Sequence, residues 1–205
     1  AQPFTAHVPV RGGAPLALAA QNVYAIAPGT DPVLKNEYVI LGAHFDHLGR
    51  STSGALDPEA GAVVRNGADD NASGTAAVLV LARRFARQPA RRSIVLANFT
   101  GEELGLLGSA WFADHAPVPL DRVQAMLNFD MVGRLRNDKL IVYGVATATE
   151  LKPLIDSASA GLGFKISAVG DGFGPSDQSS FYAKNIPVLH FFTDLHDEYH
   201  RAADK

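Results

Sequence analysis

The sequence predicts a three-layer α/β/α sandwich with a mixed, largely parallel central sheet. Short runs rich in β-branched and aromatic residues alternate with segments of helical composition. Several of these runs are apolar on both faces, as is typical of strands in a sheet that is covered on both sides. With 205 residues, of which 47% are apolar and 19% charged, the chain can bury a sizeable core.

Six runs are predicted to form strands. They are NVYAIAP (22–28), EYVILGAHFD (37–46), SIVLANFT (93–100), AMLNFDM (125–131), KLIVYGV (139–145) and IPVLHFF (186–192). Helical segments lie between them, at 71–88, 104–116, 147–161 and 176–185. The first helical segment is rich in Ala, Leu and Arg, and Pro89 follows it closely, as expected beyond a helix end. This alternation favours an α/β sandwich.

A Gly-rich polar loop spans 49–71, and a loop of that length in a compact domain is usually functional or disordered. No internal repeat or interdomain linker stands out. We therefore expect one domain over 1–205, with 1–19 as a leading segment. The chain starts without Met or a signal peptide, so we expect a piece of a longer protein with possible accessory domains.

Charge and composition exclude several partners. The net charge of −3 leaves no basic footprint for nucleic acid, and no apolar run approaches the roughly 20 residues needed to span a bilayer. The absence of Cys excludes disulfides, thiolate zinc sites and a Cys nucleophile. Any metal must therefore be bound by His, Asp and Glu.

Acidic residues and histidines gather where predicted strands end. They are His44 and Asp46, Glu102 and Glu103, Asp130, and His196 and His200, with Asp69 and Asp70 just before the first helix. In sheets of this class, ligands bind beyond the carboxyl ends of the strands. We therefore expect these side chains to meet at one rim of the sheet.

Each group also has a simple structural explanation. Asp69 or Asp70 could cap the helix that follows. Glu102 and Glu103 could complement the dipole of the helix after them. Asp130 could pair with the arginine four residues on, and the spacing in HDEYH could place two histidines on one helix face by chance.

The combination of these groups favours a metal centre. Several acids at one rim would repel one another and shift their pKa values strongly unless a cation neutralised them. Two imidazoles and three carboxylates form a donor set suited to Zn²⁺, or less specifically to Co²⁺ or Mn²⁺. Five ligands exceed one tetrahedral site but suit two metals that share a bridging carboxylate.

Six segments match the motifs of one family in the family's order. They are GAHFDHLG (42–49), NGADDNASG (66–74), TGEELGLLGS (100–109), NFDMVGR (128–134), SDQSSFY (176–182) and EYHRAAD (198–204). On these segments the chain resembles the M28 zinc peptidases, the co-catalytic metallo-aminopeptidases of bacterial secreted type. The resemblance implies the zinc-dependent exopeptidase fold (phosphorylase/hydrolase-like) and a secreted or periplasmic location.

The resemblance also implies a ligand set for two zinc ions. His44 and Asp130 would hold one zinc, Glu103 and His200 would hold the other, and Asp70 would bridge both. The substrate would be a peptide with a free N-terminus, and its N-terminal residue would be removed.

Other roles follow from the same resemblance. Glu102 would be the general base, and Asp46 would accept a hydrogen bond from the first histidine ligand. The peptide bond Asp70–Asn71 would be cis. Some relatives place a Tyr where this chain has Phe173, so Tyr199 is the expected donor to the oxyanion.

The remaining polar residues near the motifs receive structural roles. His47 is expected to line the rim, and His190 to be a core histidine with a satisfied hydrogen bond. His196 could contact a ligand or face the substrate, and Asp69 is expected to support its loop.

Three alternative functions stay open. A carboxypeptidase or dipeptidase of the same fold would need basic residues near the site, for which Arg65, Arg134 and Arg201 are candidates. A glutaminyl cyclase-like acyltransferase would work with a single zinc. A receptor-type or scaffolding relative would have lost ligands, and all five ligand positions are retained here.

Overall fold

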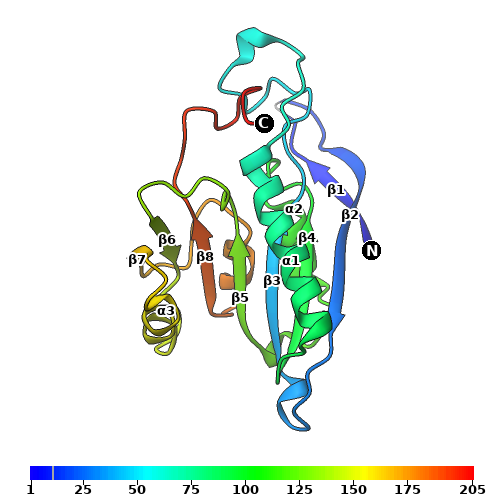
Figure 1. The fold of residues 1–205 in the computed structure, drawn as a ribbon. Coiled ribbons are helices and arrows are strands. Elements are labelled where there is room, and N and C mark those ends of the chain that lie inside the picture. Colours follow the sequence, from blue (N-terminus) through cyan, green and yellow to red (C-terminus); the bar gives the residue numbers. More distant parts are fainter. Residues whose placement is uncertain (11) are drawn as a thin grey trace.

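The computed structural model, which describes residues 1–10 and 12–205, contains one eight-stranded sheet (Figure 1). Its strands are β1 (Gln2–Val8), β2 (Leu16–Ala27), β3 (Tyr38–His44), β4 (Ser93–Phe99), β5 (Val123–Phe129), β6 (Lys139–Tyr143), β7 (Lys165–Val169) and β8 (Val188–Phe192). They are arranged in the order β1-β2-β4-β3-β5-β8-β6-β7. The four central strands β4, β3, β5 and β8 are parallel, whereas β2 and β6 run antiparallel to their inner neighbours. The predicted mixed sheet is confirmed.

All six predicted strands occur, and the sequence interpretation missed the outermost two. β1 and β7 each pair with a single neighbour, β1 with β2 and β7 with β6. An edge strand is not buried on both faces, so its sequence lacks the apolar run that marks a central strand. The predicted leading segment 1–19 therefore supplies β1 and the start of β2, which form a hairpin.

The helices are α1 (Gly74–Arg87), α2 (Leu107–Asp114), α3 (Leu151–Ser159) and α4 (Gln178–Tyr182). Shorter helical turns cover Leu34–Asn36, Pro58–Ala60, Ala68–Ser73 and Leu120–Arg122. Each of the four predicted helical segments contains one of the α-helices. Among the described residues, no helix has the length and apolar character needed to cross a bilayer.

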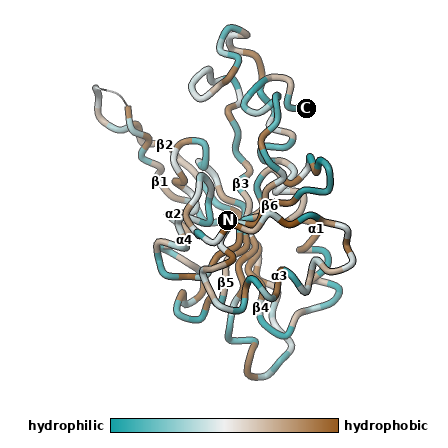
Figure 2. Tube along the Cα trace, turned by 90° about the vertical axis from the view of Figure 1, so that its left-hand side faces the viewer, coloured by the Kyte–Doolittle hydropathy of each residue, from teal (hydrophilic) through white to brown (hydrophobic). Residues whose placement is uncertain are grey.

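Alternating strand residues separate two apolar layers. Leu41 of β3 faces α1 and packs with Val78, whereas the preceding Ile40 faces the other side and packs with Phe112 of α2 and Phe181 of α4. α3 lies on the same side as α1, since Leu127 of β5 belongs to both clusters on that side. Helices on both faces complete the three layers, and Figure 2 shows the hydrophobic strands gathered at the centre.

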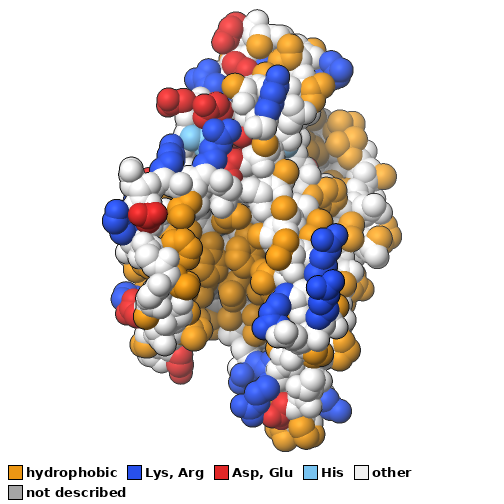
Figure 3. Space-filling model, in the orientation of Figure 1, with side chains coloured by type: hydrophobic (Ala, Val, Ile, Leu, Met, Phe, Trp, Pro, Cys, Tyr) orange, Lys and Arg blue, Asp and Glu red, His pale blue; other side chains and the backbone are white. Residues whose placement is uncertain are grey.

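The face that carries α1 and α3 is not fully covered. Figure 3 shows a hollow of hydrophobic side chains between these helices. Part of this surface is a cavity of 130 Å³ whose lining includes Leu140, Ile155 and Phe191.

The parallel strands bring the candidate residues together. His44 is the last residue of β3, Asp130 directly follows β5, and Glu102 and Glu103 follow β4. Because β3, β4 and β5 point in one direction, these residues lie at one rim of the sheet, as predicted.

Candidate metal centre

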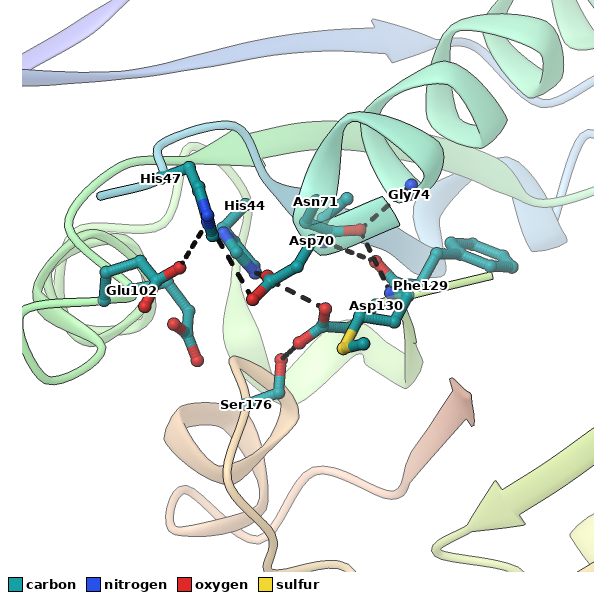
Figure 4. Close-up of polar contacts among 12 residues, drawn as sticks. His44, His47, Asp70, Asn71, Gly74, Glu102, Phe129, Asp130 and Ser176 are labelled. Atoms are coloured by element: carbon teal, nitrogen blue, oxygen red, sulfur yellow. Dashed lines mark hydrogen bonds and ion pairs between the residues drawn. The ribbon is translucent and has the colours of Figure 1, made fainter. Parts of the chain in front are cut away.

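Asp70 lies between His44 and His200 at this rim, and Figure 4 shows it beside His44 and Asp130. One of its carboxylate oxygens is 3.3 Å from His44 Nε2, and the other is 3.1 Å from His200 Nε2. His44 Nε2 is also 3.4 Å from Asp130 Oδ1, and His200 Nε2 is 3.2 Å from Glu103 Oε2. The five residues thus form two triads that share Asp70.

The donor atoms of these triads fit zinc. Zn–N and Zn–O bonds of about 2.0–2.1 Å place two ligands of a tetrahedral ion about 3.3–3.4 Å apart. The four distances from a histidine Nε2 to a carboxylate oxygen within the triads are 3.1–3.4 Å. Within the described residues, His44 Nε2 and Asp130 Oδ1 are buried without a hydrogen-bond partner. Buried polar atoms of this kind are costly unless something binds them, and a metal ion would do so.

The backbone orients both imidazoles for metal binding. His44 Nδ1 is 3.0 Å from the carbonyl oxygen of Asp46, and His200 Nδ1 is 2.9 Å from the carbonyl oxygen of Gly54. Because a carbonyl oxygen only accepts hydrogen bonds, each Nδ1 carries the proton. In the neutral imidazole that binds a metal, the free lone pair of each Nε2 then lies on the side of the shared Asp70.

The expected role of Asp46 needs a correction. Its carboxylate is 3.8 Å from His44 Nδ1, whereas its backbone carbonyl accepts the hydrogen bond. The carboxylate instead accepts a hydrogen bond from the backbone N–H of Glu102 at 3.2 Å. Asp46 therefore links the loop after β3 to the loop after β4.

The loop that carries Asp70 has a constrained backbone. The peptide bond Asp70–Asn71 is cis, as the resemblance implies. Gly67 has a positive φ of 63°, and a Cβ there would lie 2.0 Å from the Asp70 carbonyl oxygen, so the position requires glycine. The Asn71 side chain accepts hydrogen bonds from the N–H groups of Gly74 and Met131, which ties the loop to the end of β5.

Asp204 supports this loop, and the sequence interpretation did not consider it. Its carboxylate is fully buried and accepts hydrogen bonds from the N–H groups of Asp69 and Asp70, at 3.0 and 3.2 Å. Arg134 donates to the same carboxylate at 3.0 Å. Arg134 thus pairs with Asp204 and Glu198, and not with Asp130.

Asp69 supports the loop from the other side, as expected. Its carboxylate accepts a hydrogen bond from the N–H of Gly133 at 2.7 Å, and no side-chain cap to α1 is formed. His196 Nε2 is 3.3 Å from Asp69, while His196 Nδ1 is 3.0 Å from Glu198. His196 therefore contacts Asp69, which supports the loop of Asp70, and Glu198, which pairs with Arg134.

The adjacent Glu102 and Glu103 lie in opposite electrostatic environments. Burial, together with the nearby Asp177 and Asp130 carboxylates, raises the pKa of Glu102 to about 9, although His44 opposes the shift. Burial also disfavours the Glu103 carboxylate, but hydrogen bonds from His200 and His47 outweigh it and lower that pKa to about 2.

His47 contributes more than a place at the rim. Its Nδ1 is 2.7 Å from Glu103 Oε1, and its ring packs edge-on against His200 with centroids 5.6 Å apart. Donor atoms of His47, Asp70 and Glu103 lie within 4.8 Å of one another, as do those of His44, Glu102 and Asp130. His47 could thus bind the ion at the second triad, but its Nδ1 is 3.9 Å from Asp70, farther than His200 Nε2.

Ser176, the first residue of the 176–182 motif, supports Asp130 of the first triad. Ser176 Oγ donates to Asp130 Oδ2 at 2.7 Å, and Asn128 donates to Ser176 Oγ at 2.8 Å. His190 is buried and 3.2 Å from Asn128, which agrees with a core histidine that has a hydrogen-bond partner. Burial lowers the pKa of His190 to about 4, so its imidazole is neutral at pH 7.

Arg65 is fully buried inside the loop that follows β3. Its Nε donates to the Asp57 carboxylate at 2.6 Å and its Nη2 to the Asp57 carbonyl at 2.8 Å. Its Nη1 donates to the carbonyl oxygens of Ser51 and Gly61, at 3.1 and 3.2 Å. The guanidinium is therefore fully engaged, and Arg65 cannot recognise a substrate carboxylate.

The same loop holds the chain around His200. The Asp57 carboxylate accepts a hydrogen bond from the N–H of Ala202 at 2.9 Å, and Leu56 N–H donates to the His200 carbonyl at 3.0 Å. Figure 1 shows this loop beside the C-terminal segment. His200 has a positive φ of 55°, an uncommon conformation for a residue other than glycine, so its backbone needs such support.

Two cavities adjoin the triads. The first has a volume of 90 Å³, and its lining combines the acidic Glu102 and Asp130 with the side chains of Met131, Phe192 and Leu195. The second has a volume of 420 Å³ and includes Glu103 in its lining.

Tyr199, the expected oxyanion donor, lines the first cavity, and its ring stacks on His200 with centroids 3.8 Å apart. Burial and the nearby carboxylates of Asp70 and Glu103 raise the pKa of Tyr199, which keeps its hydroxyl protonated. Phe173 is exposed and packs against Tyr182.

Comparisons with known proteins agree with this geometry. A sequence profile described as "Peptidase family M28" matches residues 22–205. "Leupeptin-inactivating enzyme 1" of Streptomyces exfoliatus is 33% identical over 176 residues, which are 84% of this chain and 35% of that protein. "Leucine aminopeptidase 2" of Trichophyton equinum is 30% identical over 181 residues, with 84% and 33% covered. The chain thus spans about a third of the length of these relatives.

A solved structure of a zinc aminopeptidase from Bacillus subtilis superimposes with a TM-score of 0.73 at 26% identity. The superposition covers 94% of this chain and 47% of that one. Because the profile matches all but the first 21 residues, the protein belongs to peptidase family M28.

Proposed function

We propose that this chain is the catalytic domain of a dizinc aminopeptidase. His44 and Asp130 would hold one zinc, Glu103 and His200 the other, and Asp70 would bridge them. The observation that carries the proposal is the pair of donor triads, which share Asp70 and keep the spacing of tetrahedral ligands. The names of the relatives, a leucine aminopeptidase and a zinc aminopeptidase, support the same reading.

In this proposal Glu102 is the general base. Zinc, when bound, would supply the Lewis acidity that activates water and polarises the scissile carbonyl. Glu102 takes the proton from the attacking water and returns it to the leaving amine. Its raised pKa of about 9 refers to the cluster without cations, and positive charge nearby would restore the ionised, basic form. The Tyr199 hydroxyl donates to the oxyanion.

The first cavity favours a substrate with a free amine. Within the described residues, neither cavity beside the triads is lined by Lys or Arg, so neither offers a cation for a C-terminal carboxylate. Glu102 and Asp130 instead attract a positively charged amine. Tyr143, Phe192 and Leu195 form an apolar lining that suits one medium-sized N-terminal side chain.

Two alternatives lose support from these observations. Of the arginines considered for a carboxypeptidase, Arg65 is buried within its loop, and Arg134 is paired with Glu198 and Asp204. A single-zinc glutaminyl cyclase has no use for a second triad, and Glu103 and His200 provide one beside Asp70. Release of ammonia from peptides with N-terminal Gln would revive that reaction.

Substrate profiling tests the proposal directly. Protein loaded with zinc should contain close to two ions per chain and should hydrolyse leucyl peptides that have a free amine. The same peptides with an acetylated N-terminus should not be cleaved, because they lack the charged amine. Zinc is measured by elemental analysis and cleavage by chromatography. Cleavage that is indifferent to acetylation would refute the aminopeptidase assignment.

The two adjacent glutamates should respond differently to substitution. Glu102→Gln should keep both zinc ions and lower kcat by about a hundredfold or more, because a general base contributes 10² to 10⁴. Glu103→Gln should weaken zinc binding itself, because a ligand is replaced. Zinc affinity is measured by competition with a chromophoric chelator. If both variants bind zinc alike, the division of roles is wrong.

Tyr199→Phe should lower kcat by about tenfold or more, because one oxyanion donor is removed. Zinc content and the melting temperature should stay close to wild type, since the ring and its stacking on His200 are kept. Steady-state kinetics with zinc analysis check this prediction. Unchanged turnover would remove Tyr199 from the mechanism.

Arg65→Met should weaken the binding of one zinc ion by about tenfold or more, as is typical when a residue that supports a metal ligand is removed. The reason is that Arg65 holds the loop whose Gly54 carbonyl orients His200. Two dissociation constants from chelator competition show whether one site weakens selectively. Arg50→Met is the matched control, because Arg50 donates to Ala62 in the same loop but is exposed. Equal weakening of both sites would indicate a merely structural role.

A further inference from the structure

The larger of the two cavities has a distinct construction. One wall is the hairpin, where Phe4 pairs with Ala20 and Ala6 with Leu18, so that all four side chains share one face. Leu48, Leu104 and Leu107 add further apolar side chains to the lining. The polar part of the lining comprises Asp46, His47 and Glu103 together with the hydroxyl residues Ser51, Ser53 and Thr100. The cavity is therefore a mostly apolar cleft that includes Glu103 of the second triad in its lining.

The two cavities differ in a way that matters for an aminopeptidase. Such an enzyme must limit the space around the N-terminal residue and leave room for the rest of the peptide. The first cavity has a volume of only 90 Å³, whereas the second has 420 Å³. Asp70, Glu102 and His200 line the first cavity and Glu103 lines the second, so both cavities adjoin the candidate metal centre.

We propose that the larger cleft binds the peptide beyond the scissile bond and favours an apolar side chain in the second residue. This inference rests on the proposed aminopeptidase function. A mostly apolar lining with a few polar groups is typical of a ligand pocket. Leu18 and Leu104 line the cleft and are 40% and 49% exposed, so a bound peptide would cover apolar surface that now faces solvent.

The hairpin wall gives this specificity a defined source in the sequence. Phe4, Ala6, Leu18 and Ala20 all precede residue 22, where the match to the family begins. The hairpin wall is therefore supplied by a segment outside the part of the chain that carries the proposed metal ligands, whereas Leu48, Leu104 and Leu107 lie within that part. Substitutions in this wall should alter specificity without replacing any residue of the triads.

Kinetics with three substrates test the proposal on the zinc-loaded chain. Leucinamide has no residue after the scissile bond, Leu-Leu-amide has an apolar one, and Leu-Glu-amide has an acidic one. The wild type should prefer Leu-Leu-amide over Leu-Glu-amide in kcat/KM. In Leu18→Arg the ratio of kcat/KM for Leu-Leu-amide over leucinamide should fall by about fivefold or more, from lost apolar burial. The ratio for Leu-Glu-amide over Leu-Leu-amide should rise, because the new charge attracts the acidic residue.

Leu16→Arg is the matched control, since Leu16 lies on the same strand and is 52% exposed but does not line the cleft. Its ratios should equal those of the wild type. Leu18→Ser, a smaller change, should lower the first ratio without raising the second. Hydrolysis with ratios unchanged in both Leu18 variants would overturn this inference alone. Absence of hydrolysis of every substrate by the zinc-loaded wild type would overturn the proposed function and this inference with it.

Discussion

Asp70 presents one carboxylate oxygen to His44 and the other to His200, within a group of buried acids at the rim of the sheet. Buried carboxylates so close together repel one another, so positive charge is needed to stabilise their ionised forms. Although burial alone lowers the pKa of His200, the Asp70 and Glu103 carboxylates raise it to about 10. The His44 pKa is likewise held well above 6.5 by Asp130 and Asp70, against the effect of burial. Without metal the cluster retains protons, and bound metal cations would replace them.

The surrounding structure serves to hold this charge cluster in place. Parallel strands bring the ligands to one edge, but the strands alone do not orient the side chains. Orientation comes from backbone groups, such as the carbonyl oxygens of Asp46 and Gly54 that fix the two imidazoles. Buried charged residues in turn hold the backbone. Arg65 bonds to Asp57 within the loop that contains Gly54, and Asp204 accepts a hydrogen bond from the N–H of Asp70. The geometry of the candidate metal centre therefore depends on residues outside its two triads, such as Arg65 and Asp204.

The sequence predicts the central fold well because buried strands and amphipathic helices carry strong local signals. β1 and β7 escaped prediction because an edge strand needs no apolar run. The gathering of acidic residues and histidines at one rim was predictable because these residues follow strands, and parallel strands have their carboxyl ends at the same edge of the sheet. Asp204, His47 and Arg65 were missed or misassigned because their roles arise from tertiary contacts. Neither spacing nor composition shows that a carbonyl from another loop will lie beside His200.

The adjacent pair Glu102 and Glu103 shows how a fold can separate the chemistry of identical residues. Neighbouring side chains diverge, so Glu103 reaches His47 and His200 while Glu102 turns toward His44 and Asp130. The two imidazoles stabilise the charged form of Glu103, and its pKa falls to about 2. Burial among other acids destabilises the charged form of Glu102, and its pKa rises to about 9. A carboxylate that stays ionised suits a metal ligand, whereas one that can hold a proton suits a base that must return it. The direction in which each side chain leaves the backbone thus determines which of the two tasks it can perform.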